Sequence, residues 1–115
     1  MKRGNTMDRP VTEIALAYGD AIYELRSHKS RRWSQRDLAR AIGTSNSVVY
    51  QWEMGWTTPS RRSVDRLCSA FKITRTEFKQ RIDACRRDIR RVQREAAKQG
   101  SAVVLDEMAQ LSRIT

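Results

Sequence analysis

The sequence predicts an all-α protein. Apolar residues recur at helical spacing along the chain, and no stretch alternates apolar and polar residues as a half-buried strand does. A serine or threonine stands directly before four of these periodic stretches, where such residues cap the N-terminal end of a helix. A length of 115 residues is typical of one domain with an appended element.

The first two helices are defined by their starting residues and apolar faces. Thr12 begins a helix whose buried face we predict to be Ile14, Tyr18, Ala21, Ile22 and Leu25. A polar, basic connector follows over residues 28–32. Ser34 caps the second helix, and Asp37 completes a capping-box-like pair at its positive end. Gly43 ends that helix, because glycine takes the left-handed conformation without strain.

Two further helices and the start of a fifth come next. Thr44 or Ser45 caps a helix that runs to about Glu53. Ser60 caps the following helix, and residues 73–74 lead into the fifth. The predicted buried face of the fourth helix consists of Val64, Leu67, Cys68 and Phe71.

The chain is strongly basic, with 23 Lys+Arg against 13 Asp+Glu and a formal net charge of +10 at pH 7. This surplus indicates a polyanion or an anionic surface as partner, although a merely soluble basic protein is the alternative. Positive charge is heavier in residues 61–115, with 14 Lys+Arg against 7 Asp+Glu, than in residues 1–60, with 9 against 6.

The composition argues against several other classes of function. Cys68, Cys85 and His28 cannot supply a four-ligand zinc site with the usual spacing, so we expect no metal and no cofactor. One histidine leaves little for acid–base or triad catalysis, so we expect no enzyme. The chain lacks a run of about 18 apolar residues and a secretory signal, so we expect no membrane contact and a reducing cytoplasm.

The stretch QRDLARAIGTSNSVVYQW, residues 35–52, predicts two short helices joined by a tight turn. A small residue, Ala39, stands where two helices would cross most closely. The inward-facing residues are Leu38, Ala39, Ile42, Val49 and Trp52, and the outward-facing ones are Asn46, Ser47, Tyr50 and Gln51. Asn and Gln side chains pair with adenine in the major groove, so the pattern predicts a DNA-binding helix-turn-helix. A polar, solvated face is the alternative.

A resemblance to a known family supports this prediction. Leu25-Arg26, WSQRDLARAIGTSNSVVYQWEMG and TTPSRRSVDRLCSAFKITRTEF together resemble the Cro/C1-type (XRE-family) helix-turn-helix of phage repressors and bacterial regulators. The resemblance covers about residues 17–78. It implies a five-helix, lambda-repressor-like domain, placed here at residues 12–78, that binds duplex DNA sequence-specifically and usually as a dimer.

The resemblance also assigns roles to individual residues. It implies that Gln35 contacts a phosphate, and that an Arg26–Glu53 ion pair joins the first and third helices. Asn46, Ser47 and Gln51 would approach base edges, with Ser60, Arg61 and Arg62 near the backbone. The full set of expected DNA-binding residues is Gln35, Thr44, Ser45, Asn46, Ser47, Tyr50, Gln51, Ser60, Arg61 and Arg62.

Two segments depart from the family pattern. The connector before Ser34 is about two residues longer than usual, and its extra cations, Lys29, Arg31 and Arg32, either reach phosphates or are only solvated. Trp56 stands where small or basic residues are common. We expect it to pack on the fourth helix, with a position along the DNA backbone as the alternative.

Residues 79–115 are expected to form a helical dimerisation extension. The spacings 4, 3, 4, 3, 4 define a heptad seam of Phe78, Ile82, Cys85, Ile89, Val92 and Ala96. We favour a second copy as the partner of this seam over docking on the chain's own domain. The opposite face carries Arg86, Arg87, Arg90, Arg91 and Arg94, which either contact a second polyanion or are solvated. Residues 100–101 are expected to break the helix before a last one.

These observations together predict a homodimeric transcriptional regulator of prokaryotic or phage origin. We expect a repressor that sits on the nucleoid in the cytoplasm, binds a palindromic operator and places its third helix in the major groove. One alternative is an antitoxin of the same fold, with a protein partner bound through the C-terminal segment. Another is an interaction adaptor that no longer recognises DNA.

Overall fold

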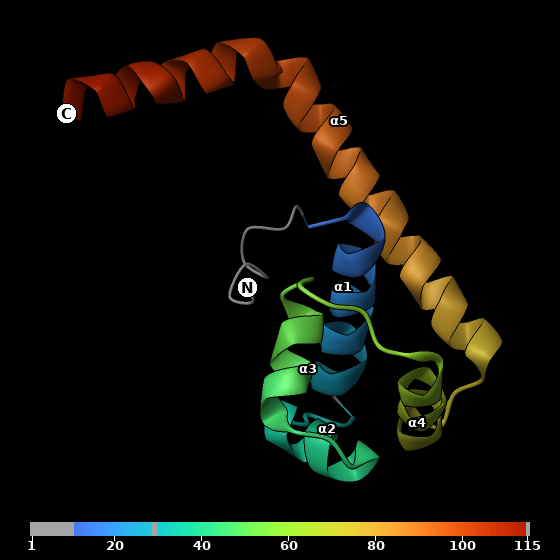
Figure 1. The fold of residues 1–115 in the computed structure, drawn as a ribbon. Helices are drawn as coiled ribbons and strands as arrows, with labels where there is room; N and C mark the ends of the chain where they lie inside the picture. Colours follow the sequence, from blue (N-terminus) through green and yellow to red (C-terminus); the bar gives the residue numbers. More distant parts are fainter. Residues whose placement is uncertain (1–10, 29, 115) are drawn as a thin grey trace.

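The protein is described from a computed structural model, which covers residues 11–28 and 30–114, with side chains described as far as residue 99. The described residues form helices and no strands, as the sequence predicts. In chain order the helices are α1 (Glu13–Ser27), α2 (Gln35–Ile42), α3 (Asn46–Glu53), α4 (Arg61–Phe71) and α5 (Arg75–Ile114) (Figure 1).

The predicted helix starts are confirmed by their caps. The side chains of Thr12, Ser34, Ser45 and Ser60 each accept a hydrogen bond from a backbone N–H in the first turn of the helix that follows. Ser34 and Asp37 form a reciprocal capping box, which lowers the pKa of the Asp37 carboxyl. A second capping box, which the sequence analysis missed, joins Thr74 and Glu77 at the start of α5.

The helix ends agree less well with expectation. Gly43 ends α2 in the left-handed conformation with φ 75°, as predicted. Lys72 ends α4 in the same left-handed conformation with φ 59°. A lysine does not predict this conformation, which is uncommon for residues other than glycine. The predicted break at residues 100–101 is wrong, since α5 is one helix from Arg75 to Ile114. A single glycine inside a helix costs only about 1 kcal/mol. The side chains of the expected last helix, which follows residues 100–101, lie outside the described residues.

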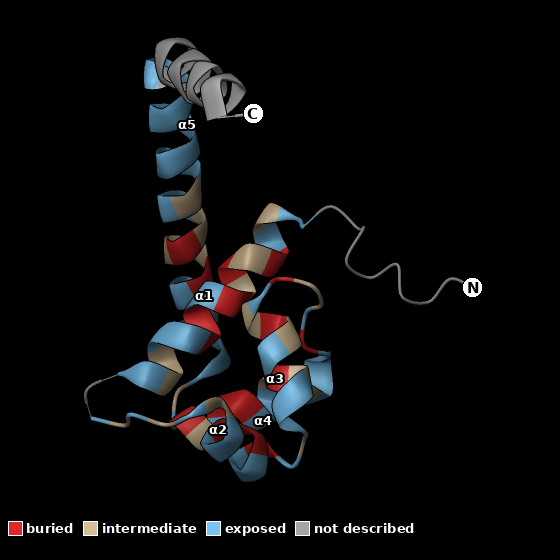
Figure 2. Cartoon of the chain, turned by 90° about the vertical axis from the view of Figure 1, so that its left-hand side faces the viewer, coloured by how far each residue is buried: buried red, intermediate tan, exposed pale blue. Residues whose placement is uncertain are grey.

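One of the small residues on α1 lets α3 approach it closely. Ala15, Ala17, Gly19 and Ala21 are all buried on this helix. A Cβ atom built at Gly19 would lie 2.5 Å from the Trp52 carbonyl oxygen, so only glycine fits there without a shift of α3. The buried residues gather where α1, α2, α3 and α4 meet the first turns of α5 (Figure 2).

The first half of the predicted seam packs inside its own chain. Phe78, Ile82 and Cys85 are 2%, 5% and 3% exposed and belong to the core, and the Phe78 ring meets Tyr18 of α1 edge-on. Their assignment to a dimer interface is therefore corrected, because α1 already covers this face of α5. Ile89 is half-buried against the core, whereas Val92 is 59% exposed and Ala96 is exposed. Only this outer part of the seam is open to a second chain.

The connector between α1 and α2 is held by Arg31. Its guanidinium donates to the carbonyl of Leu25 near the end of α1 and to the carbonyl of Phe71 at the end of α4, the latter at 3.0 Å. It also lies over the rings of Trp33 and Phe71. Neither expected role describes Arg31, which caps two helix ends instead. Arg32 is exposed, and Lys29 lies outside the described residues.

Candidate nucleic-acid interface

The outward face of α3 carries four polar side chains, Asn46, Ser47, Tyr50 and Gln51, which we name the recognition surface. Three of them are exposed, and Gln51 is half-buried and donates to the Ser47 hydroxyl at 3.4 Å. The opposite side of the helix is anchored by Val49 and Trp52, which are 0% and 4% exposed. The structure therefore brings the four predicted side chains to one face, which a partner can approach.

Glu53, the last residue of α3, joins that helix to both α1 and α2. Its carboxylate accepts hydrogen bonds from Arg26 Nε at 2.7 Å and Nη2 at 2.8 Å, and Oε1 accepts a third from Gln35 Nε2 at 3.0 Å. The Arg26 and Glu53 side chains are only 12% and 9% exposed. The hydrogen bonds to Glu53 raise the pKa of the Arg26 guanidinium. The ion pair implied by the family resemblance is therefore present, and Gln35 is part of the same network.

A hollow of about 570 Å³ lies beside the start of α2 and the start of α3. It is lined by Arg26, Ser34, Gln35, Arg36 and Asn46. Arg26 and Gln35 are already bonded to Glu53, so the exposed side chains of Arg36 and Asn46 are the more available donors there. Arg36 is not among the site residues predicted from the sequence, although a cation directly after Gln35 in the first turn of α2 is a visible signal.

Trp56 packs beside α3. Its ring meets the Tyr50 ring edge-on, with centroids 5.6 Å apart and planes at 90°, and its backbone N–H donates to the Gln51 carbonyl at 3.0 Å. The aromatic contact is therefore with α3 and not with the fourth helix, where we expected it. Tyr50 is still 43% exposed, so this contact supports one edge of the recognition surface without covering it.

The remaining predicted DNA-binding residues serve as caps or stand in a first turn. Ser45 and Ser60 accept backbone hydrogen bonds as N-caps. Thr44 is half-buried, and its N–H donates to the Ala39 carbonyl at 2.9 Å. Arg61 and Arg62 are exposed in the first turn of α4, and no described contact joins them to the hollow beside Asn46. The caps leave these exposed cations in fixed positions at the start of α4.

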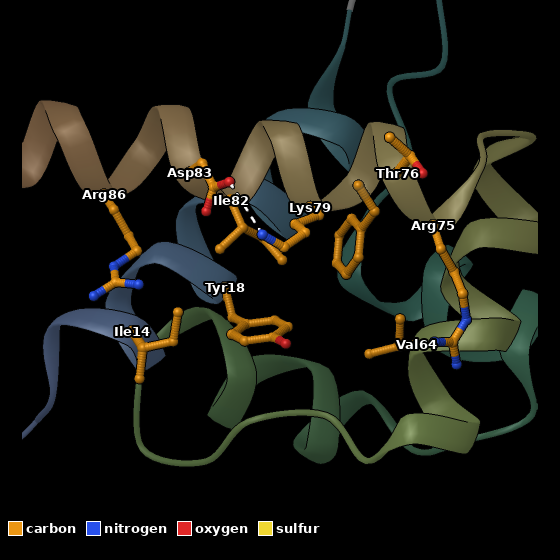
Figure 3. Close-up of a pocket in the computed structure, with 10 residues that line it drawn as sticks. Ile14, Tyr18, Val64, Arg75, Thr76, Lys79, Ile82, Asp83 and Arg86 are labelled. Carbon is orange, nitrogen blue, oxygen red and sulfur yellow. Dashed lines mark ion pairs between the residues drawn. The ribbon is translucent and has the colours of Figure 1, made fainter.

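A second hollow, of about 380 Å³, lies between α1, α4 and α5 (Figure 3). Its apolar lining comes from Ile14, Tyr18, Val64, Phe78 and Ile82. The cations around it are each paired with an acid: Lys79 with Asp83 at 3.6 Å, Arg75 with Asp65 at 2.6 Å and Arg86 with Glu13 at 2.9 Å. This balance of charge gives the second hollow no preference for a polyanion, unlike the region around Arg36.

The comparison with known families assigns the domain. Residues 22–78 match the family model described as Helix-turn-helix, which covers the end of α1, all of α2, α3 and α4, and the beginning of α5. The fold and the exposed face of α3 thus define a helix-turn-helix DNA-binding protein of the class found in transcriptional regulators. More particularly, residues 22–78 of this chain belong to the Cro/C1-type (XRE) family.

Four further findings accompany this family assignment. No curated protein is significantly similar to the chain in sequence. The Cro/C1-type family is generally non-enzymatic. Within the described ranges, no three His, Cys, Asp or Glu side chains come together in a way that could hold a metal ion. None of the helices in the described part of the chain has the length and apolar character needed to cross a membrane.

Proposed function

We propose that the protein is a sequence-specific transcriptional repressor that places α3 in the major groove of its operator. The observation that carries the proposal is the recognition surface: four polar side chains on an exposed face, behind which Glu53 ties α3 to α1 and α2. A helix held in this way keeps its angle when it enters the groove, and its side chains then meet base edges in a defined register.

Individual contacts follow from the chemistry of each side chain. Asn46 and Gln51 present amides that suit adenine N6 and N7, and Ser47 presents a hydroxyl that suits either a base or a phosphate. Gln35 can donate its second amide hydrogen to a phosphate oxygen while the first stays on Glu53. Arg61 and Arg62 contribute sequence-independent contacts to phosphates, which set the position of the domain on the duplex.

We further propose that two copies bind one palindromic operator. The exposed Val92 and Ala96, together with the half-buried Ile89, continue the apolar stripe of α5 beyond the part that α1 covers. The two half-sites of such an operator lie about 34 Å apart, one for each copy of α3. The proposed mode of repression is that the protein, bound at this site in the cytoplasm, blocks polymerase. In the antitoxin alternative, the C-terminal segment binds a protein partner. The side chains of that segment beyond residue 99 lie outside the described residues.

Selection from a randomised duplex library tests recognition by α3. The wild-type protein should enrich one motif with two-fold symmetry. Gln51→Ala should relax the base preference at one position of each half-site and weaken binding by about 1–3 kcal/mol. Gln93→Ala is the matched control, because Gln93 is an exposed glutamine of α5 away from α3. A Gln51→Ala motif identical to the wild-type motif would remove Gln51 from base recognition, and the absence of any enriched motif would refute the proposed function.

Sedimentation tests the proposed pairing of α5. Val92→Asp should convert the dimer to a monomer, because it places a charge in the apolar stripe between the chains. Gln93→Asp introduces the same side chain one position away and should leave the dimer intact. Circular dichroism is expected to show unchanged helix content in both variants, since both positions are exposed. A Val92→Asp protein that still sediments as a dimer would rule out this interface.

A further inference from the structure

Four cationic side chains form a continuous stripe on α5. They are Arg87, Arg91, Arg94 and Lys98, which we name the α5 basic stripe, and spacings of four, three and four residues place them on one side of the helix. All four are exposed. Arg91 lies 3.5 Å from Asp88 in an exposed pair. Within residues 11–28 and 30–99, the other three make no ion pair.

The stripe faces away from the rest of the domain. Arg87 stands two residues after Cys85 and two residues before Ile89, and positions two apart in a helix are separated by about 200° around its axis. Cys85 is buried against α1, and Ile89 packs against the core. The stripe is therefore opposite the buried face, and pairing of two α5 helices through Val92 and Ala96 would leave it uncovered.

The stripe and the recognition surface lie on different sides of the molecule. Figure 1 shows the first turns of α5 on the side of α1 away from α3, and the rest of α5 running on past the start of α1. The end of α3 packs against α1 at Gly19, whereas α5 packs against α1 through the contact between Tyr18 and Phe78. In each case the exposed side chains point away from α1. A duplex that lies along the recognition surface is therefore not the one that the stripe of the same chain would contact.

The chemistry of the stripe fits the backbone of duplex DNA. Its four charges span twelve residues, from Arg87 to Lys98, which is about 16 Å along the helix axis. One strand of duplex presents about five phosphates over that length. No aromatic or aliphatic side chain interrupts the stripe, so it lacks the stacking platform of a single-strand binder. It also lacks the apolar centre that is typical of a protein–protein interface.

We propose that the α5 basic stripe is a second, sequence-independent binding surface for the phosphate backbone of duplex DNA. A molecule held on its operator by α3 would then hold a second segment of duplex along α5, away from the recognition surface. The proposal goes beyond the function proposed above and rests on it only for the place of the first duplex. Its consequence is that a bound regulator can bridge two stretches of DNA.

A two-duplex capture assay tests the proposal. A duplex that carries the full selected motif is fixed to beads and saturated with labelled protein, and capture of a second, fluorescent duplex of random sequence is then measured. The test variant is Arg87→Gln/Arg94→Gln/Lys98→Gln. The matched control, Lys72→Gln/Lys79→Gln/Arg81→Gln, removes the same number of charges from exposed cations outside the stripe. Glutamine is a helix former comparable to Arg and Lys, so both variants should fold.

The salt dependence of capture gives the expected size of the effect. Four phosphate contacts predict a slope of about −3.6 in log affinity against log salt, so the wild-type capture affinity falls about 150-fold between 50 and 200 mM salt. The triple stripe variant keeps one phosphate contact, so its capture affinity should be much weaker at 50 mM salt. That affinity should then fall only about 3.5-fold between 50 and 200 mM salt. The control variant should behave as the wild type. Retention of labelled protein on the beads should be the same for all three proteins.

Two results would overturn the inference. One is equal capture by the stripe variant and the control variant. The other is tighter capture of single-stranded RNA or polyglutamate than of duplex DNA at equal charge concentration. Loss of protein from the beads, or failure to select a motif, would count against recognition by α3 instead. In that case the same capture is measured with the protein fixed to the beads through an N-terminal tag, which keeps the two proposals separately testable.

Discussion

Replacing Gly19 with alanine would test how closely α1 and α3 pack. Gly19 is buried in the middle of α1, and the carbonyl oxygens of Trp52 and Glu53 lie against it. An added Cβ would lie 2.5 Å from the first oxygen and 2.8 Å from the second. Ordinary C···O contacts lie at about 3.3–3.6 Å, so the end of α3 must move outward by roughly 0.5–1 Å.

The net effect on stability has two opposing parts. Alanine is the better helix former and stabilises α1 by about 1 kcal/mol relative to glycine. Overpacking a tight site costs about 1–3 kcal/mol, and the upper part of that range applies because both obstructing atoms belong to the backbone. We therefore expect Gly19→Ala to lower the free energy of unfolding by about 1–2 kcal/mol, with a fall of at least about 4 °C in melting temperature.

Urea unfolding followed by circular dichroism measures this change. The control is Asp20→Ala at the exposed neighbouring position, which improves helix propensity without meeting α3 and should leave stability equal or higher. DNA binding by Gly19→Ala should weaken as well, because the displaced residues include Glu53, which fixes the angle of α3. A Gly19→Ala protein as stable as Asp20→Ala would show that the backbones of α1 and α3 are not in contact at this position.

Three further predictions concern charged and titrating groups. Glu53→Gln should cost about 3 kcal/mol in urea unfolding, because it leaves the nearly buried Arg26 without its partner, and a loss under 1 kcal/mol would contradict this. Arg31→Ala should destabilise the protein without changing the salt slope of DNA binding, since Arg31 caps two helix ends; a lower slope would instead indicate a phosphate contact. Burial raises the pKa of the Cys85 thiol from 9.0 to about 11, so the folded state favours the neutral thiol. The folded state is therefore stabilised in full below pH 9, and this stabilisation is lost as the pH rises through about 11. Cys85→Ala lacks the thiol, so its free energy of unfolding should fall less steeply over this pH range. Equal falls would show that the thiol does not titrate differently on unfolding.

Local signals predicted most of the helix boundaries. Ser34, Asp37 and Gly43 act within one or two turns of each other, so their capping roles follow from sequence spacing alone. The need for glycine at position 19 could not be predicted from sequence spacing, because it depends on where α3 lies in space. The periodic stripe of α5 correctly indicated a buried face. Periodicity does not say what covers that face, and α1 covers its first half through Phe78 and the residues that follow.

The candidate interface also has some features that the sequence predicts and others that depend on contacts between helices. Helical period alone places Asn46 and Ser47 outward, and the structure agrees. The bond from Gln35 to Glu53 joins residues 18 positions apart on different helices, so spacing within one helix could not predict it. The same limit explains the partner of Trp56, whose contact with Tyr50 depends on the path of the loop after α3.

The position of Arg31 has a consequence for how the domain opens. Its guanidinium holds the carbonyls of Leu25 and Phe71, which are far apart in the chain, and it lies against Trp33 in the connector. The hydrogen bonds of Arg31 therefore couple the end of α1, the connector and the end of α4. Hydrogen exchange should give the amide protons of these three segments one shared free energy of opening, as a single cooperative unit of local unfolding.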